Sequence, residues 1–291
     1  MMHLFLLLMV MTGLGLYIWR VLNPRQAEVL TVPYKWKVIL EDHVHFYQNL
    51  DTTQKTQFES DVQHFLTEVT ISGVQTEVTL LDRLLIASSA VIPLFGFPAW
   101  TYSHLDEVLL YPDSFDERYN IGGPNARISG MVGNGPMEGK VIFSKPALHR
   151  GFDINNDKRN VGIHEFVHLF DKEDGLIDGI PPSFVDQAHT GPWLELIRKE
   201  TNQIMKSKST IDSYAGYNQQ EFLAVASEYF FERPHLLKKK EPELYDTLCE
   251  VFKQDPSRIV SKDTYGVPTR IPRNAACPCG SGLKYKRCCM E

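Results

Sequence analysis

The pattern His-Glu-x-x-His at residues 164–168 constrains this chain more than any other stretch. On a helix, residues four apart lie on one face, so His164 and His168 can direct both imidazoles at one metal ion. Glu165 would then lie where its carboxylate can take a proton from a water that the metal activates. The alternative is a pair of core histidines bonded to backbone carbonyls. The metal site is favoured, because apolar residues surround the pattern and predict a buried helix: Val161, Ile163, Phe166, Val167, Leu169 and Phe170.

A second predicted helix, residues 219–232, offers carboxylates that could complete this site. A catalytic zinc usually has three protein ligands and one position for water. Glu221 and Glu228 lie two turns apart on one face, and their spacing alone does not show which of them reaches the metal. Asp171 shares the helix face of the two histidines. We expect its carboxylate to accept the N–H of a ligand imidazole.

Hydrophobic periodicity in the rest of the chain predicts helices around a small mixed sheet, and therefore an α+β fold. Helices are expected within residues 32–70 and at 76–92, and strands at 68–71, 107–111 and 140–144. The turn signal Asn134-Gly135 predicts that the last of these strands returns from a hairpin. If strand 140–144 lay at the sheet edge beside the metal helix, it could pair with an extended peptide substrate.

The N-terminal stretch from Met2 to Trp19 is almost entirely apolar and long enough to span a bilayer. Basic residues follow it, beginning with Arg20, and none precedes it, which disfavours the alternative of a cleaved signal peptide. We therefore expect a transmembrane anchor over residues 1–22. The positive-inside rule then predicts a single-pass protein of the bacterial inner membrane, with its catalytic domain in the cytoplasm.

The cysteine distribution and the charge limit the remaining possibilities. Four of the five cysteines lie in the last fifteen residues, which favours a metal cluster over a disulfide framework. These four could enclose a tetrahedral structural zinc; disulfides between them are the alternative. A net charge of -6 argues against direct nucleic-acid binding, because no broad basic surface is available.

Residues 68–234 resemble the Mlc titration factor A family, bacterial zinc metallopeptidases of the gluzincin kind. The matching stretches are residues 108–112, 164–168 with Asp171, 178–181 and 221–231. The resemblance implies a zincin-like peptidase domain over residues 23–255, with Glu221 as the third zinc ligand and Glu228 in a structural role. It also implies that Tyr214 assists catalysis, and Tyr217 is its substitute if the register is shifted.

The end of the chain, residues 275–291, resembles the SEC-C motif, which occurs at the C-terminus of the SecA translocation ATPase. Its ligand positions are matched by four cysteines: Cys277, Cys279, Cys288 and Cys289. A linker at 256–274, containing three prolines, precedes it. The resemblance implies a structural zinc knuckle that docks a protein partner, such as a chaperone, the ribosome or the translocon.

Three functions are consistent with these patterns. The favoured one is a membrane-tethered zinc peptidase with one catalytic and one structural zinc. The family resemblance implies aminopeptidase-like action on small peptide substrates. The second is a binding protein that sequesters a transcriptional repressor, the role for which the resembling family is named. The third is an adaptor that works through its SEC-C tail. An intact set of ligands together with Glu165 favours the peptidase, because a protein that only binds has no need of a general base.

Overall fold

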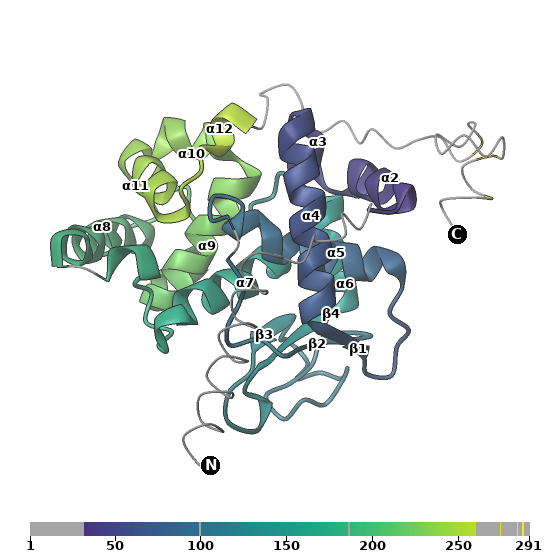
Figure 1. Ribbon diagram of the computed structural model, residues 1–291. Helices are drawn as coiled ribbons and strands as arrows, with labels where there is room; N and C mark the ends of the chain where they lie inside the picture. Colours follow the sequence, from purple (N-terminus) through teal and green to yellow (C-terminus); the bar gives the residue numbers. More distant parts are fainter. Residues whose placement is uncertain are drawn as a thin grey trace, which may run out of the picture. The chain divides into compact units, whose positions relative to one another are not determined.

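The computed structural model describes residues 32–98, 100–185 and 187–259, and the single positions 274, 284 and 287. The chain divides into two units, Met1–Pro33 and Tyr34–Glu291, and all the elements below belong to the second (Figure 1). The elements up to the end of the sheet are α2 (Tyr34–His43), α3 (His45–Gln48), α4 (Thr52–Glu68), β1 (Thr70–Gly73), α5 (Leu80–Leu94), β2 (Glu107–Tyr111), β3 (Gly130–Val132) and β4 (Lys140–Ser144). They are followed by α6 (Lys145–Asp153), α7 (Val161–Asp171), α8 (Gln187–Met205), α9 (Gln219–Glu232), α10 (Pro234–Lys240), α11 (Pro242–Phe252) and α12 (Pro256–Ile259).

The sheet has four strands in the order β1-β2-β4-β3. Strands β1, β2 and β4 are parallel, and β3 pairs antiparallel with β4. Side chains alternate between the two faces, so Val108 and Phe143 pack into the main core, whereas Tyr111 and Ile142 join a smaller cluster around Phe115. Figure 1 shows α4, α5 and α7 lying over one side of the sheet. This arrangement places the helix with the His-Glu-x-x-His pattern next to the strands.

Strands β2 and β4 begin and end where the sequence predicts, and β3 forms the expected hairpin with β4. The prediction that residues 140–144 form an edge strand is wrong, because β4 lies between β2 and β3. A parallel crossover through α5 joins β1 to β2, and β4 then adds in parallel to β2, which leaves β3 at the edge. The edge strand beside α7 is therefore residues 130–132.

The predicted fold class and localisation need correction. The described residues form a mixed α/β structure with a four-stranded sheet and eleven α-helices, in which helices alternate with parallel strands. The expected anchor over residues 1–22 lies outside the described residues. Among the helices that are described, none has the length and apolar character needed to cross a bilayer. The apolar helix α5, for example, has 15 residues and carries Asp82 and Arg83. The structure thus does not support the prediction of a single-pass inner-membrane protein.

Helix α7 lies deep in the structure because close contacts on one side draw it against α5. Gly162 has so little room that an added Cβ would lie 2.0 Å from Ser89 Oγ and 2.7 Å from Ser89 Cβ. Phe166 is fully buried, and its ring contacts Phe65, Tyr102 and Phe143 at centroid distances of 5.2 to 6.0 Å. The helix that carries the candidate ligands is consequently fixed by the core on the face opposite to them.

We expect Gly162→Ala to lower the free energy of unfolding by about 1–3 kcal/mol, because the new methyl group would force Ser89 and α5 to shift. Gly191→Ala is the matched control, since an added Cβ in α8 meets no atom within 4 Å. Alanine stabilises a helix relative to glycine, so the control should gain about 0.5–1 kcal/mol. Chemical denaturation of both variants measures the difference, and equal stability of the two would contradict the close packing of α7 on α5.

Candidate metal centre

Three side chains from two helices converge on one point. The Nε2 atoms of His164 and His168 on α7 lie 3.2 Å apart. Glu221, on α9, places Oε2 3.1 Å from His164 Nε2 and Oε1 3.7 Å from His168 Nε2. One ligand atom from each residue lies within 4.8 Å of the others, so a single ion could contact all three. Of the three glutamates on α9, Glu221 is the one whose carboxylate lies in this group, because Glu228 contacts the other ring nitrogen of His164, Nδ1.

Two asparagines position these ligands by capping their helices. The side chain of Asn160 accepts the backbone N–H of Ile163 at 3.1 Å and so begins α7 just before His164. Asn218 accepts the backbone N–H of Glu221 at 2.8 Å and sets the first turn of α9. Neither cap was predicted from the sequence, although an asparagine directly before a helical pattern is a signal for a helix start.

Glu228 fixes the orientation of the His164 ring. Its Oε1 lies 2.8 Å from His164 Nδ1, and its Oε2 accepts the backbone N–H of Asn160 at 2.5 Å. An ionised carboxylate can only accept, so Nδ1 of His164 carries the proton. In the neutral imidazole, Nε2 then has a free lone pair directed at His168 and Glu221, which is the arrangement of a metal-ligating histidine.

The electrostatics of the cluster favour a positive charge at its centre. Burial by itself raises the pKa of Glu221, but the adjacent imidazoles of His164 and His168 lower that pKa to about 2. Burial lowers the pKa of His164, yet the carboxylates of Glu221 and Glu228 outweigh it and raise the pKa well above its ordinary value. Two imidazoles and a carboxylate are also the ligand types of catalytic zinc sites. The residues thus fit a divalent cation such as zinc.

Glu165 lies beside this cluster and is held against strand β3. Its side chain is only 6% exposed, and burial raises the pKa of its carboxyl group. A Cβ on Gly130 would approach Glu165 Oε1 to 2.6 Å and the side chain of Val161 to 2.5 Å. Glycine at position 130 therefore allows the edge strand to pass close to the carboxylate of Glu165. Strand periodicity in the sequence does not reveal that a glycine is needed at this position.

Tyr214 flanks the cluster from the short 3-10 turn Ser213–Gly216. Its ring centroid lies 6.2 Å from that of His164, and 53% of the residue is exposed. Burial, together with the charges of Glu221 and Glu165, raises the pKa of its hydroxyl group. Tyr217 stacks on Tyr214 with an interplanar angle of 14° and is 77% exposed. Of the two tyrosines, Tyr214 is thus the one in contact with the candidate ligands.

Asp171 contacts the backbone of a loop. Its Oδ2 accepts the N–H of Gly179 at 2.8 Å, and no hydrogen bond joins it to either imidazole in this described region. Gly179 has a φ of +80° and packs so closely on Gln219 and Gln220 that an added Cβ would lie 2.5 Å from the backbone of Gln219. Asp171 is buried, which raises its pKa to about 7. Its carboxyl group anchors the loop that abuts the start of α9, two residues before Glu221.

Comparison with known proteins agrees with this geometry. A family model described as glucose-regulated metallo-peptidase M90 matches residues 19–253, most of the chain. The chain belongs to this family. Membership in this family indicates a metallopeptidase, which is a class of enzyme that uses a metal ion.

Relatives of this M90 family member cover nearly the same length. An uncharacterized protein of Synechocystis sp., slr2042, is 28% identical over 269 residues, which are 86% of this chain and 97% of the relative. Proteins named Mlc titration factor A from Yersinia enterocolitica and Yersinia pestis are each 25% identical over 82% of this chain, covering 91% and 90% of their own lengths. The resemblance to the Mlc titration factor A family is confirmed.

A SEC-C motif matches residues 273–291 of this M90 family member, which confirms the resemblance of its tail. The four cysteines expected to bind a structural zinc lie outside the described residues, at positions 277, 279, 288 and 289. The linker was predicted over residues 256–274. Its first four residues, Pro256–Ile259, form the short helix α12.

We expect Glu228→Gln to weaken zinc binding by about 10–100-fold, the range found when a partner of a ligating histidine is removed. The carboxylate accepts from both His164 and Asn160, whereas an amide presents one oxygen and one NH2 group to these two donors. Glu232→Gln is the matched control, because Glu232 is a buried carboxylate one turn further along α9 that bonds the backbone of Arg159. Competition with a zinc chelator measures both affinities. Equal affinity in the two variants would show that Glu228 does not support His164.

Proposed function

We propose that this protein hydrolyses peptide bonds, using a zinc ion held by His164, His168 and Glu221 and Glu165 as the general base. The observation that carries this proposal is the convergence of three ligand atoms within 4.8 Å beside a buried carboxylate. A zinc ion bound there supplies Lewis acidity, which lowers the pKa of water and polarises a carbonyl group. The side chains around it account for the remaining steps.

Glu165 moves the proton. Its carboxylate takes a proton from the attacking water as the water oxygen bonds to the scissile carbonyl carbon, and it then delivers that proton to the amine nitrogen as the C–N bond breaks. A general base works best when its pKa lies near the working pH, and burial raises the pKa of Glu165 in that direction. The close approach of Gly130 restricts where this carboxylate can point.

Tyr214 is proposed to stabilise the carbonyl oxygen as it gains negative charge. Burial and the nearby carboxylates raise the pKa of its hydroxyl, so the group stays protonated and can donate a hydrogen bond. The Tyr214 side chain is partly exposed, so a substrate can reach it. Its ring contacts His164 and therefore lies beside the proposed metal ligands.

Strand β3 is proposed to hold the substrate in an extended conformation. It pairs with β4 on one side, and no further strand among the described residues occupies its other edge. Free backbone N–H and C=O groups on an edge strand can pair with a peptide of any sequence. Because Gly130 places this strand against Glu165, a peptide aligned there would pass close to the general base.

Hydrolysis of short chromogenic peptides by the full-length protein tests this function. A panel with free and with blocked N-termini separates aminopeptidase from endopeptidase action. We expect activity to disappear with a chelator and to return when zinc is restored. Activity that persists after the metal is removed would contradict the proposal, as would a lack of hydrolysis across the panel by protein shown to contain zinc.

The name Mlc titration factor A, carried by the Yersinia relatives, favours binding of a regulatory protein as a second candidate function. Such binding need not involve the general base. If it occurs, Glu165→Gln should bind the regulator as tightly as the unmodified protein does, and co-purification with candidate transcriptional repressors would detect it. Loss of the interaction in Glu165→Gln would link binding to the catalytic site.

We also propose that Cys277, Cys279, Cys288 and Cys289 hold a second, structural zinc and that this tail docks a chaperone, the ribosome or the translocon. The match to the SEC-C motif over residues 273–291 supports it. Four thiolates leave no position for water, so this zinc would have no catalytic role. Replacing Cys288 and Cys289 by serine should remove one equivalent of zinc and leave peptide hydrolysis unchanged.

A further inference from the structure

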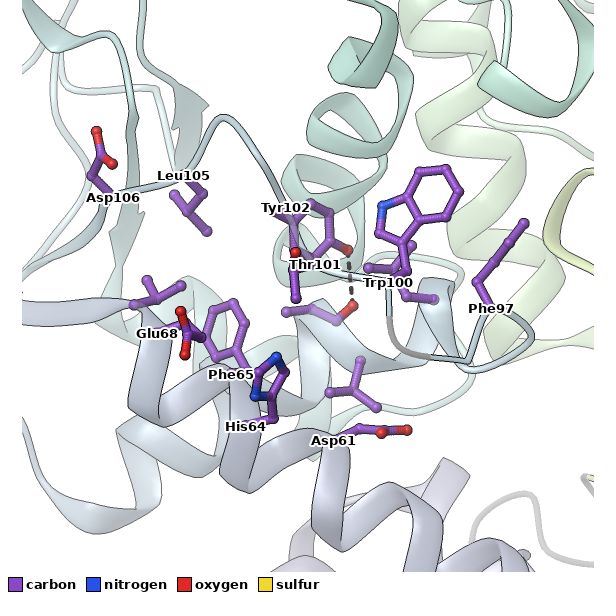
Figure 2. Close-up of a pocket in the computed structure, with 14 residues that line it drawn as sticks. Asp61, His64, Phe65, Glu68, Phe97, Trp100, Thr101, Tyr102, Leu105 and Asp106 are labelled. Atoms are coloured by element: carbon purple, nitrogen blue, oxygen red, sulfur yellow. Dashed lines mark hydrogen bonds between the residues drawn. The ribbon is translucent and has the colours of Figure 1, made fainter. Parts of the chain in front are cut away.

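Two exposed tyrosine rings lie next to the metal centre. Among the described residues, the aromatic side chains that are largely exposed are Tyr34, Tyr214 and Tyr217. Tyr34 begins α2, which packs on α3 and α5, whereas Tyr214 contacts His164. Tyr102, by contrast, is buried, and its hydroxyl donates to the carbonyl oxygen of Ala90 at 2.8 Å, as Figure 2 shows. Exposed aromatic rings that adjoin a candidate site indicate a surface that contacts a ligand.

The rings of Tyr214 and Tyr217 lie nearly parallel beside the metal ligands. Their centroids are 6.2 Å apart, with an interplanar angle of 14°, and the ring of Tyr214 lies 6.2 Å from that of His164. Tyr217 directly follows the 3-10 turn that carries Tyr214, and side chains three residues apart in such a turn lie one above the other. Because Tyr217 is 77% exposed, most of its ring is open to a further apolar group.

The backbone that carries these two rings is fixed on both sides. Asp212 accepts the N–H of Tyr214 at 3.0 Å through Oδ1, and its Oδ2 accepts a hydrogen bond from Arg159 Nη2 at 2.8 Å. The N–H of Tyr217 donates to the carbonyl oxygen of Tyr214 at 3.0 Å, and the next residue, Asn218, caps α9. Tyrosine has few rotatable bonds, so a ring on a fixed backbone can bind a ligand with little loss of conformational entropy.

We propose that Tyr214 and Tyr217 form a binding site for an aromatic or large aliphatic side chain of the peptide substrate. This inference rests on the proposed function, in which the scissile carbonyl group lies at the metal ligands and Tyr214. The two centroid distances put the ring of Tyr217 no more than about 12 Å from that of His164, which an extended peptide spans in about four residues. The recognised side chain therefore lies within about four residues of the bond that is cleaved.

The chemistry of these rings favours an apolar side chain over a charged one. A phenylalanine ring that packs on Tyr217 gains both the burial of apolar surface and an aromatic contact. An arginine side chain could also stack on the ring, but a cation–π contact at an exposed site is weaker than this combination. We therefore expect phenylalanine to be preferred, followed by leucine and then by arginine.

Peptide binding to zinc-loaded, full-length Glu165→Gln tests this inference without requiring hydrolysis. The probes are short peptides of one host sequence built from alanine and serine, with phenylalanine, leucine, arginine or alanine at a single position. We expect calorimetric titration to show that the phenylalanine peptide binds about tenfold more tightly than the alanine peptide. Equal affinity for these two peptides, or tighter binding of the arginine peptide, would overturn the inference.

Variants made in the same Glu165→Gln background assign the preference to this surface. Tyr217→Ser should reduce the preference for phenylalanine over alanine from about tenfold to about twofold, whereas Tyr217→Phe should retain it because the ring is kept. Tyr34→Ser makes the same change at an exposed tyrosine of α2 and is the matched control. A tenfold preference that survives Tyr217→Ser would also overturn the inference.

Hydrolysis by the unmodified protein locates the recognised side chain relative to the cleaved bond. When the phenylalanine is moved along the host peptide, mass spectrometry should find that the cleaved bond moves with it, at a constant distance of at most about four residues. Cleavage positions unrelated to the phenylalanine would contradict the inference. A lack of any cleavage would contradict the proposed function alone, because the binding comparison judges the tyrosine pair separately.

Discussion

Replacing Glu165 with Gln should lower kcat/KM for peptide hydrolysis by about 10²–10⁴-fold or more while the protein keeps its zinc. Glutamine has nearly the same shape and fits against Gly130, but it cannot accept the proton of the attacking water. The three proposed metal ligands are unchanged in this variant, so its zinc content should match that of the unmodified protein. Peptide assays together with metal analysis on one preparation measure both quantities.

A matched control for Glu165→Gln is Glu138→Gln, an exposed carboxylate that forms an ion pair with Lys172 at the surface. This control should retain hydrolysis. Hydrolysis at the normal rate by zinc-loaded Glu165→Gln would show that another group acts as the base. Loss of zinc from this variant would instead make Glu165 part of the metal site.

Replacing Glu221 with Ala should abolish zinc binding at the catalytic site and peptide hydrolysis together. The variant removes one of three ligands, so the loss of affinity should exceed the roughly 10–100-fold expected for Glu228→Gln. Chelator competition measures the affinity, and unfolding without metal shows whether the variant remains folded. The neighbouring change Gln219→Ala affects an exposed residue on the same helix turn and should leave zinc binding intact. Full zinc affinity in Glu221→Ala would contradict the proposed ligand set.

The local elements of this fold could be predicted from the sequence because their signals are local. The bounds of β2, β4 and α9 follow from apolar periodicity and flanking turn residues, and α7 follows from the apolar residues around His164 and His168. The start of α5 lies four residues later than expected, since Thr79 and Asp82 form a capping box that begins the helix at Leu80.

Arrangements between elements could not be predicted in the same way. The choice between Glu221 and Glu228 depends on how α9 packs across α7, and helical spacing allows both. It was the family resemblance that implied Glu221. The role of Asp171 likewise depends on the loop at Gly179, whose position is set by contacts with α9. The place of β4 inside the sheet follows from the pairing order, which side-chain alternation does not encode.

The apolar N-terminal stretch shows a different limit of prediction. Hydropathy and the positions of arginine and lysine predicted a membrane-spanning helix over residues 1–22, and this stretch lies outside the described residues. Among the described helices, the apolar α5 packs in the core, where twelve of its fifteen residues are buried.

Zinc-edge anomalous diffraction from crystals of the full-length protein would test the central claim most directly. The account predicts a strong peak between the Nε2 atoms of His164 and His168 and the carboxylate of Glu221. Crystals grown with zinc that show no peak between these three side chains would contradict it.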